Sequence, residues 1–237
     1  MDALPDADRI DPAALNPDHP AIVARLITLA ELAAAGRMDA FNYLAGQLPE
    51  IPVGKTIPVM GITGTGGAGK SSLTDELVVR LVNDLTDIRV GILSCDPSRR
   101  KTGGALLGDR IRMNAIETPR VFMRSIAVRR TSMELPVALP DAVDILKRAG
   151  YDLIIVETAG IGQGASNIID LSDLSVYVMT SDYGAATQLE KIDMLDYADI
   201  VVVNKFDKEG SDDALRDVRK QVQRNRKAWD APAGALP

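Results

Sequence analysis

The sequence predicts an α/β fold in which a mainly parallel β-sheet lies between helices. Two features of the 237-residue chain indicate this fold. Short apolar runs bounded by turn residues alternate with helical segments, and a glycine-rich loop joins the first of these runs to a helix. Parallel strands that are covered on both faces form continuous apolar runs and need helical crossovers between them. With 46% hydrophobic residues, the chain can bury a sizeable core.

The order of the segments predicts most of this sheet. We expect strands at residues 57–62, 90–94, 153–157, 174–180 and 200–204. We expect helices at residues 70–84, 137–149, 185–196 and 211–228, and an earlier helix over 21–46 that Gly36 interrupts. The expected organisation is a flexible lead at 1–20, a helical linker or extension at 21–54 and the main domain at 55–237.

Composition and charge argue against several classes of function. The net charge of −6 argues against nucleic acid or an anionic membrane as the main partner. The single cysteine, Cys95, excludes an internal disulfide bond and suits a reducing compartment. Residues 1–20 lack the basic and apolar regions of a signal peptide, and no apolar run reaches the roughly 18 residues of a membrane span. We therefore expect a cytoplasmic protein that binds neither nucleic acid nor membrane.

Residues 64–71 form the complete P-loop pattern G-x-x-x-x-G-K-S, between an expected strand and an expected helix. Glycines let backbone N–H groups surround an anion without Cβ clashes, and the helix N-terminus favours negative charge. The residues expected to bind the phosphates are Gly64, Gly66, Gly67, Ala68, Gly69, Lys70, Ser71 and Ser72. Lys70 would reach the β- and γ-phosphates as a catalytic cation, and the Ser71 hydroxyl would bind Mg²⁺. The fold class is then an α/β P-loop NTPase preceded by a short helical segment; the alternative is a glycine-rich loop with an incidental lysine.

A second motif, N-K-x-D at residues 204–207, follows the last expected strand and predicts recognition of guanine. The Asp207 carboxylate can accept hydrogen bonds from guanine N1 and N2, a donor pair that adenine lacks. Lys205 would lie along the base and Asn204 would brace the loop. Strand ends are where an open parallel sheet binds ligands, although the tetrapeptide alone also fits a polar turn.

Three acidic residues are candidates for the Mg²⁺ site. Asp96 follows the strand at 90–94, Glu157 ends the strand at 153–157, and Asp109 lies between them. Mg²⁺ prefers a few carboxylates together with water and phosphate oxygens. The alternative for each residue is a helix cap or a solvated acid.

A glycine-rich loop, residues 160–164, follows Glu157. The backbone N–H of Gly160 could sense the γ-phosphate and release the loop after hydrolysis. Gln163 is the catalytic candidate for positioning the attacking water, and Arg110 or Arg112 could stabilise charge in the same chain. The cations at 99–112 would otherwise form a solvated surface or dock an acidic partner.

Three segments, at residues 95–98, 101–113 and 157–163, resemble the GTPase chaperones of cobalamin-dependent acyl-CoA mutases. Glu157-Thr158 stands where most regulatory GTPases have Asp-x-x-Gly, which makes it a specific marker. The resemblance covers about residues 55–230 and is closest to the G-domains of fused isobutyryl-CoA mutases, in which chaperone and mutase share one chain.

The resemblance implies roles for individual residues. Ser71, Asp96, Asp109 and Glu157 would hold Mg²⁺ with Thr158 close by. Arg112 would contact the nucleotide, and residues 181–191 would match an extra switch that relays nucleotide state to the mutase. Family members gate cobalamin loading and protect or reactivate the mutase, with GTP hydrolysis as a timer, and we expect a homodimer.

Two departures from the family pattern qualify this expectation. A complete G-domain has one more strand after N-K-x-D, so we expect the domain to be truncated before its last strand. The sequence also lacks the cobalamin motif Asp-x-His-x-x-Gly, so adenosylcobalamin would bind only in a partner or in fused mutase domains. Three rival functions remain open: a GTP/GDP-binding structural module that does not hydrolyse GTP, a P-loop kinase of a small molecule, and a nickel-insertion GTPase.

Overall fold

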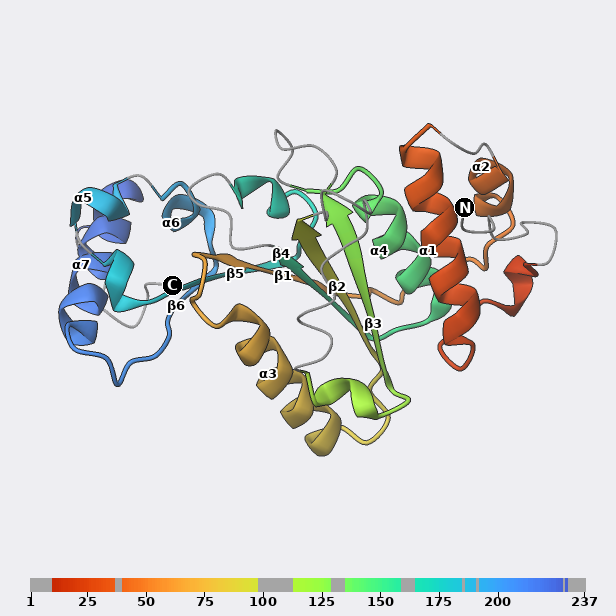
Figure 1. The fold of residues 1–237 in the computed structure, drawn as a ribbon, viewed down its shortest axis with the longest axis horizontal. Helices are drawn as coiled ribbons and strands as arrows, with labels where there is room; N and C mark the ends of the chain where they lie inside the picture. The colour runs from red at the N-terminus through yellow and green to blue at the C-terminus, as the bar shows by residue number, and fades with distance from the viewer. Residues whose placement is uncertain are drawn as a thin grey trace. The chain divides into compact units, whose positions relative to one another are not determined.

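The computed structural model describes residues 10–36, 40–97, 113–128, 135–158, 165–184, 186–190, 192–227 and 229. Six strands form one sheet in the order β3-β2-β4-β1-β5-β6 (Figure 1). Their bounds are β1 Val59–Gly64, β2 Val90–Pro97, β3 Val121–Val128, β4 Leu153–Thr158, β5 Leu174–Met179 and β6 Ile200–Val203. The pairs β1–β5, β2–β3 and β5–β6 are all parallel. The predicted α/β class with a parallel sheet is therefore confirmed.

Helices and 3-10 turns connect these strands. The α-helices are α1 Pro20–Ala34, α2 Ala40–Ala45, α3 Lys70–Asp84, α4 Leu139–Ala149, α5 Ala186–Leu189, α6 Met194–Tyr197 and α7 Ser211–Asn225. The 3-10 turns are η2 Pro12–Ala14, η4 Ala115–Glu117, η5 Ala165–Ile168 and η6 Ser181–Tyr183. None of the helices in the described ranges is long and apolar enough to cross a membrane.

The chain divides into two compact units, of which the first comprises Met1–Pro58 and Asp75–Ile155. In this unit β2 pairs with β3 from Val90 opposite Val121 to Pro97 opposite Val128. Helix α1 packs against α2, α4 and β3, and Figure 1 shows α1 beside α4. The buried side chains of α1 are Val23, Leu26, Ile27, Leu29, Ala30 and Leu32. The helical segment before the P-loop is thus part of the core of the first unit.

Local sequence explains the limits of α4. Pro140 lies in the first turn, where a missing N–H costs nothing, and Gly150 ends the helix in the left-handed conformation with φ of 92°. Asp141 lies in the first turn and Lys147 and Arg148 in the last, so both ends complement the helix dipole. Burial and the neighbouring Asp144 raise the pKa of Asp141.

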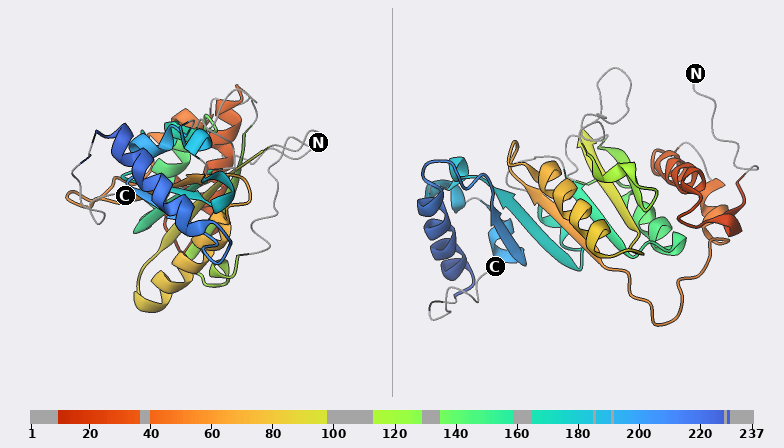
Figure 2. Two further views of the ribbon diagram at one scale, coloured as in Figure 1. Left: turned by 90° about the vertical axis from the view of Figure 1, so that its left-hand side faces the viewer. Right: turned by 90° about the horizontal axis from the view of Figure 1, so that it is seen from below.

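The second unit comprises Val59–Thr74 and Val156–Pro237 and contains both sequence motifs. Strand β5 lies between β1 and β6, with Gly64 opposite Val178 and Met179 opposite Val203. Helix α7 packs against α5, α6 and β6, and the right-hand view of Figure 2 shows α7 next to the end strand β6. The motif-bearing loops after β1 and β6 therefore start from two strands that flank the same neighbour.

One strand was missed and one predicted helix was wrong. The predictions omit β3, whose apolar run is interrupted by Arg124 and Ser125 at its centre. The continuous helix expected over 185–196 is instead two short helices, α5 and α6, with Ile192 N–H bonded to the Leu189 carbonyl between them. The remaining predicted strands are present with shifts of a few residues at their ends.

Candidate nucleotide site

The P-loop connects the end of β1 to the start of α3, as predicted. Gly64 has φ of +145°, and a Cβ at this position would lie 1.9 Å from the Val178 carbonyl oxygen. Gly67 and Gly69 also have positive φ values, of 72° and 90°. Only glycine adopts these conformations readily, so the shape of this loop requires glycine at these positions. Gly66 and Gly67 are exposed, Ala68 is buried, and Ser72 is exposed in the first turn of α3.

The Lys70 ammonium lies inside the loop. Its Nζ atom is 3.2 Å from the Gly64 carbonyl oxygen and 3.1 Å from that of Thr65, and the residue is 7% exposed. These carbonyl oxygens hold the positive charge in the interior of the loop. The role of this cation toward phosphate stays a prediction.

Ser71 and Glu157 come together across 86 positions of sequence. The Ser71 hydroxyl donates to Glu157 Oε1 at 2.6 Å, and the Thr74 hydroxyl lies 3.1 Å from Glu157 Oε2. Glu157 is 3% exposed, and a carboxylate so deeply buried needs compensation for its lost hydration. A hydroxyl oxygen beside a buried carboxylate oxygen is a hard-oxygen donor set that suits Mg²⁺.

Thr158 lies one residue beyond Glu157, at the end of β4, but its hydroxyl points to a different partner. Thr158 Oγ1 donates to Thr63 Oγ1 at 2.8 Å, and both residues are buried. This pair joins the end of β4 to the end of β1, just before the P-loop begins. A role for Thr158 at the metal stays a prediction.

The N-K-x-D loop is tied directly to the P-loop. Asn204 Nδ2 donates to the Ala68 carbonyl at 2.8 Å, and Lys205 Nζ donates to the Gly67 carbonyl at 2.8 Å. Lys205 has a positive φ of 54°, which turns the chain sharply after Asn204. Asp207 follows on the exposed side of this turn. The structure thus brings the two predicted motifs together, with Asn204 and Lys205 as the connection.

Comparison with known proteins now decides the family. Residues 23–235 match the family described as methylmalonyl Co-A mutase-associated GTPase MeaB. The chain belongs to the MeaB family.

Relatives of the MeaB-family chain include much longer proteins. It is 55% identical over 217 residues to the fused isobutyryl-CoA mutase of Geobacillus kaustophilus, covering 91% of this chain and 20% of the relative. It is 61% identical over 182 residues to the fused isobutyryl-CoA mutase of Cupriavidus metallidurans, covering 76% of this chain and 17% of the relative. The chain therefore spans about one fifth of the length of these relatives.

Solved structures agree on the fold. The crystal structure of LAO/AO transport system kinase matches with a TM-score of 0.59 at 24% identity, covering 89% of this chain and 60% of that one. At this identity the match shows a shared fold and nothing finer.

In this MeaB-family chain, the segment expected to act as an extra switch packs on α7. Lys208 Nζ donates to Asp182 Oδ2 at 2.8 Å, and the Thr180 hydroxyl donates to the same oxygen at 3.1 Å. The hydrogen bond from Lys208, then that from Thr180, holds the pKa of Asp182 below its ordinary value. The contact continues further along α7, where a Cβ on Gly184 would lie 2.4 Å from Ala214 Cβ. This segment therefore starts beside the N-K-x-D loop.

Several predicted site residues fall outside the described part of the chain. These are Asp109, Arg110, Arg112, Gly160 and Gln163, together with the side chain of Asp96, whose backbone lies in β2. Their roles stay predictions. Thr74, by contrast, was not predicted, because its contact with Glu157 joins residues 83 positions apart and no local pattern marks it.

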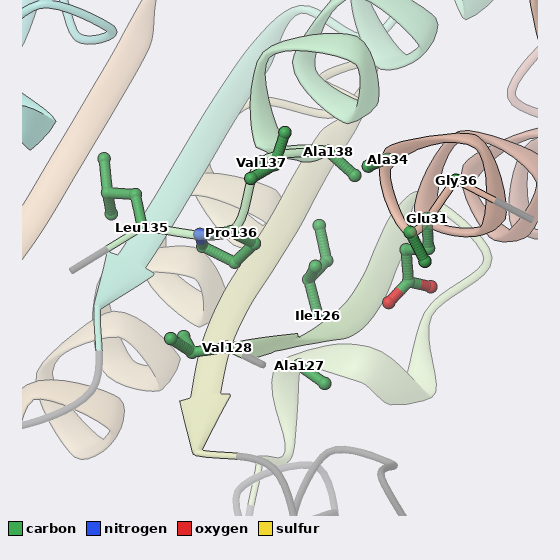
Figure 3. Close-up of a pocket in the computed structure, with 11 residues that line it drawn as sticks. Glu31, Ala34, Gly36, Ile126, Ala127, Val128, Leu135, Pro136, Val137 and Ala138 are labelled. Atoms are coloured by element: carbon green, nitrogen blue, oxygen red, sulfur yellow. The ribbon is translucent and has the colours of Figure 1, made fainter. Parts of the chain in front are cut away.

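A separate apolar cavity of about 730 Å³ lies in the first unit (Figure 3). Its walls come from the end of α1, the end of β3 and the start of α4, with Ile126 facing Ala138 and Ala34. The Glu31 carboxylate at its edge is paired with Arg124 at 2.8 Å. The described residues that line this cavity include no member of the P-loop or the N-K-x-D loop.

Proposed function

We propose that this chain binds GTP and GDP with Mg²⁺ and hydrolyses GTP. The observation that carries the proposal is the set of contacts at the P-loop. Lys70 lies inside the loop, and the adjacent Ser71 donates to Glu157. Two carbonyls of the same loop accept hydrogen bonds from Asn204 and Lys205. A cation, a hard-oxygen pair and a base-reading loop are the three parts that a guanine nucleotide site requires. The membership of the MeaB family supports the same reading.

At the phosphate end, backbone N–H groups of the P-loop would bind the β-phosphate. Lys70 would exchange the Gly64 and Thr65 carbonyls for phosphate oxygens and stabilise charge that develops during γ-phosphoryl transfer. Ser71 and Glu157 would hold Mg²⁺, which would neutralise charge on the β- and γ-phosphates. Gln163 is our candidate for orienting the attacking water.

At the other end, Asp207 would accept hydrogen bonds from guanine N1 and N2. The Lys205 stem would cover one face of the base, since its Nζ atom is held at the Gly67 carbonyl. An adenine base would leave the Asp207 carboxylate without donors, and this loss gives the discrimination.

We further propose that the chain serves as chaperone or G-domain of a cobalamin-dependent acyl-CoA mutase. Names of long relatives, fused isobutyryl-CoA mutases, support this role, as does the family description. In this role the nucleotide state would gate cofactor loading and reactivation, and adenosylcobalamin would bind in the mutase. The homodimer expected from the resemblance stays a prediction.

Nucleotide binding and turnover by the 237-residue chain test the proposal. Titration with fluorescent GDP and ADP, with and without Mg²⁺, should show a magnesium-dependent preference for GDP. Lys70→Ala should lower affinity for GTP by about 100-fold, as expected for losing one or two charge-assisted hydrogen bonds, and should abolish turnover. Lys220→Ala, which removes an exposed lysine of α7, is the matched control and should leave both unchanged. Unchanged turnover in a folded Lys70→Ala protein would contradict the assignment.

Phosphate release measured with and without the mutase separates hydrolysis from a purely structural role. We expect slow release by the chain alone and faster release with the mutase present. No release in either condition, together with tight GDP binding, would identify a structural nucleotide module. A strong preference for ATP would instead favour the kinase alternative.

A further inference from the structure

Thr74 is a fully buried threonine that reaches the carboxylate of the candidate metal site. It lies four residues after Lys70 in α3 and is 0% exposed. Its Oγ1 atom is 3.0 Å from the Lys70 carbonyl oxygen and 3.1 Å from Glu157 Oε2. One hydroxyl therefore joins the first turn of α3 to the end of β4.

The hydroxyl has a single proton and two acceptors within reach. An ionised carboxylate attracts a proton donor more strongly than a peptide carbonyl does, so the bond to Glu157 is the stronger of the two. The helix restricts the χ1 angle of this β-branched residue and keeps its Oγ1 atom 3.0 Å from the Lys70 carbonyl oxygen. Thr74 therefore presents a donor whose direction is set by the helix.

This donor acts on one of the two carboxylate oxygens, while Ser71 acts on the other. Ser71 Oγ lies 2.6 Å from Oε1, and Thr74 Oγ1 lies 3.1 Å from Oε2. Two donors on opposite oxygens restrict the rotation of the carboxylate plane. A hydroxyl that binds a metal through a lone pair can still donate its proton, so both contacts are compatible with metal at Ser71.

We propose that Thr74 is a positioning residue that fixes the Glu157 carboxylate so that Oε1 faces Ser71 and the metal. The inference rests on the proposed function, because it assumes Mg²⁺ at Ser71 and Glu157. Hydrogen-bond partners of metal ligands are worth about 10- to 100-fold in metal affinity. Loss of the Thr74 hydroxyl should therefore weaken Mg²⁺ binding without lowering the affinity of the P-loop for the nucleotide in the absence of metal.

Calorimetric titration of Mg²⁺ into the chain saturated with a non-hydrolysable GTP analogue tests this inference. Thr74→Val keeps the shape and removes the donor, so the Mg²⁺ dissociation constant should rise about 10-fold or more. Thr74→Ser keeps the hydroxyl and should stay within about threefold of the wild type. Thr28→Val removes another hydroxyl that bonds the carbonyl four residues back, in α1 of the first unit, and should not change Mg²⁺ binding.

Two further measurements separate positioning from packing. Analogue affinity measured in EDTA should be the same for wild type and Thr74→Val. In a Glu157→Ala background, which removes the acceptor of Thr74, Thr74→Val should cause no further loss of Mg²⁺ affinity. If Thr74→Val does not fold, Thr74→Ala takes its place with the same expectations. The inference is overturned if the valine or alanine variant binds Mg²⁺ as the wild type does, or if the serine variant is equally impaired. Absence of Mg²⁺ binding by the wild-type chain would instead overturn the proposed function.

Discussion

The charged residues at the P-loop end of the candidate site are buried, whereas three residues of the N-K-x-D loop (residues 204–207, the base-reading loop) are exposed, although both belong to the same unit. Lys70 and Glu157 are 7% and 3% exposed, and the hydroxyls around them are buried or half-buried. In the base-reading loop, Phe206 is 45% exposed and Asp207 is also exposed. The two ends of the candidate site therefore differ in how far their side chains are buried.

This difference follows from the strands that carry the two loops. The P-loop follows β1, an interior strand, whereas the base-reading loop follows β6, which lies at the end of the sheet and begins with the 42%-exposed Ile200. Packing in the core of the sheet therefore fixes the conformation of the P-loop. The base-reading loop depends instead on the hydrogen bonds that Asn204 and Lys205 make to P-loop carbonyls. Substitutions that change the backbone or the core should thus have their largest effect at the P-loop. The base-reading loop should be most sensitive to the loss of a few polar contacts.

Gly64→Ala should have the largest effect on stability and binding, because it introduces a clash at the buried start of the P-loop. The new Cβ would lie 1.9 Å from the Val178 carbonyl oxygen at a φ of +145°. We expect the free energy of unfolding to fall by about 3 kcal/mol or more and nucleotide binding to be lost. Gly54→Ala is the matched control: it also has positive φ but open space around it, so it should cost only about 1–2 kcal/mol. Equal losses in urea unfolding would show that backbone strain alone, not close packing against β5, fixes the loop.

Asp207→Asn should change base selection without changing stability. The asparagine offers one acceptor and an NH₂ donor, so it no longer matches the two guanine donors but matches the carbonyl at C2 of xanthine. We expect affinity for GDP to fall roughly 100-fold and affinity for xanthosine diphosphate to rise. Asp212→Asn, a nearby exposed acid in the first turn of α7, should change neither. Loss of stability in the Asp207 variant would contradict the expectation that this exposed side chain contributes little to folding.

The same contrast explains what the sequence could predict. The P-loop and N-K-x-D motifs are contiguous, so their residue types predict their chemistry directly. The place of Glu157 at a strand end was predictable because this residue follows an apolar run. The contacts of Thr74 with Glu157 and of Lys208 with Asp182 join separate segments, and no local pattern encodes them.

Long-range pairing also explains the strand that the predictions omitted. Strand β3 carries Arg124 at its centre, a residue that normally argues against a buried strand. Arg124 is accommodated because it pairs with Glu31 of α1, 93 positions earlier in the chain. A sequence pattern cannot show that such a partner will be near.

Gly69→Ala probes the junction between the two ends and should have an intermediate effect. Its Cβ would lie 2.7 Å from Asn204 Nδ2, whereas Gly67→Ala, also at positive φ, would meet nothing within 4 Å. Both variants carry backbone strain, but only Gly69→Ala should also displace Asn204 from the Ala68 carbonyl. We expect it to cost about 1 kcal/mol more than Gly67→Ala in urea unfolding without nucleotide. This excess should disappear when both are compared in an Asn204→Ala background, and an excess that persists would place the strain elsewhere.

Lys208→Gln should have the smallest effect, because the Lys208–Asp182 bridge is exposed. Without the lysine, the Asp182 pKa should rise toward its ordinary value of 3.8, which carbon NMR titration measures. A folded-state pKa below the unfolded one stabilises the protein above about pH 3.8, and this contribution is lost as pH falls through the lowered value. The difference in stability between wild type and variant should therefore be present at pH 7 and shrink in acid, and GDP affinity should change by less than about threefold. A loss of guanine affinity as large as that of Asp207→Asn would mean that this bridge, and not the P-loop carbonyls, positions the base-reading loop.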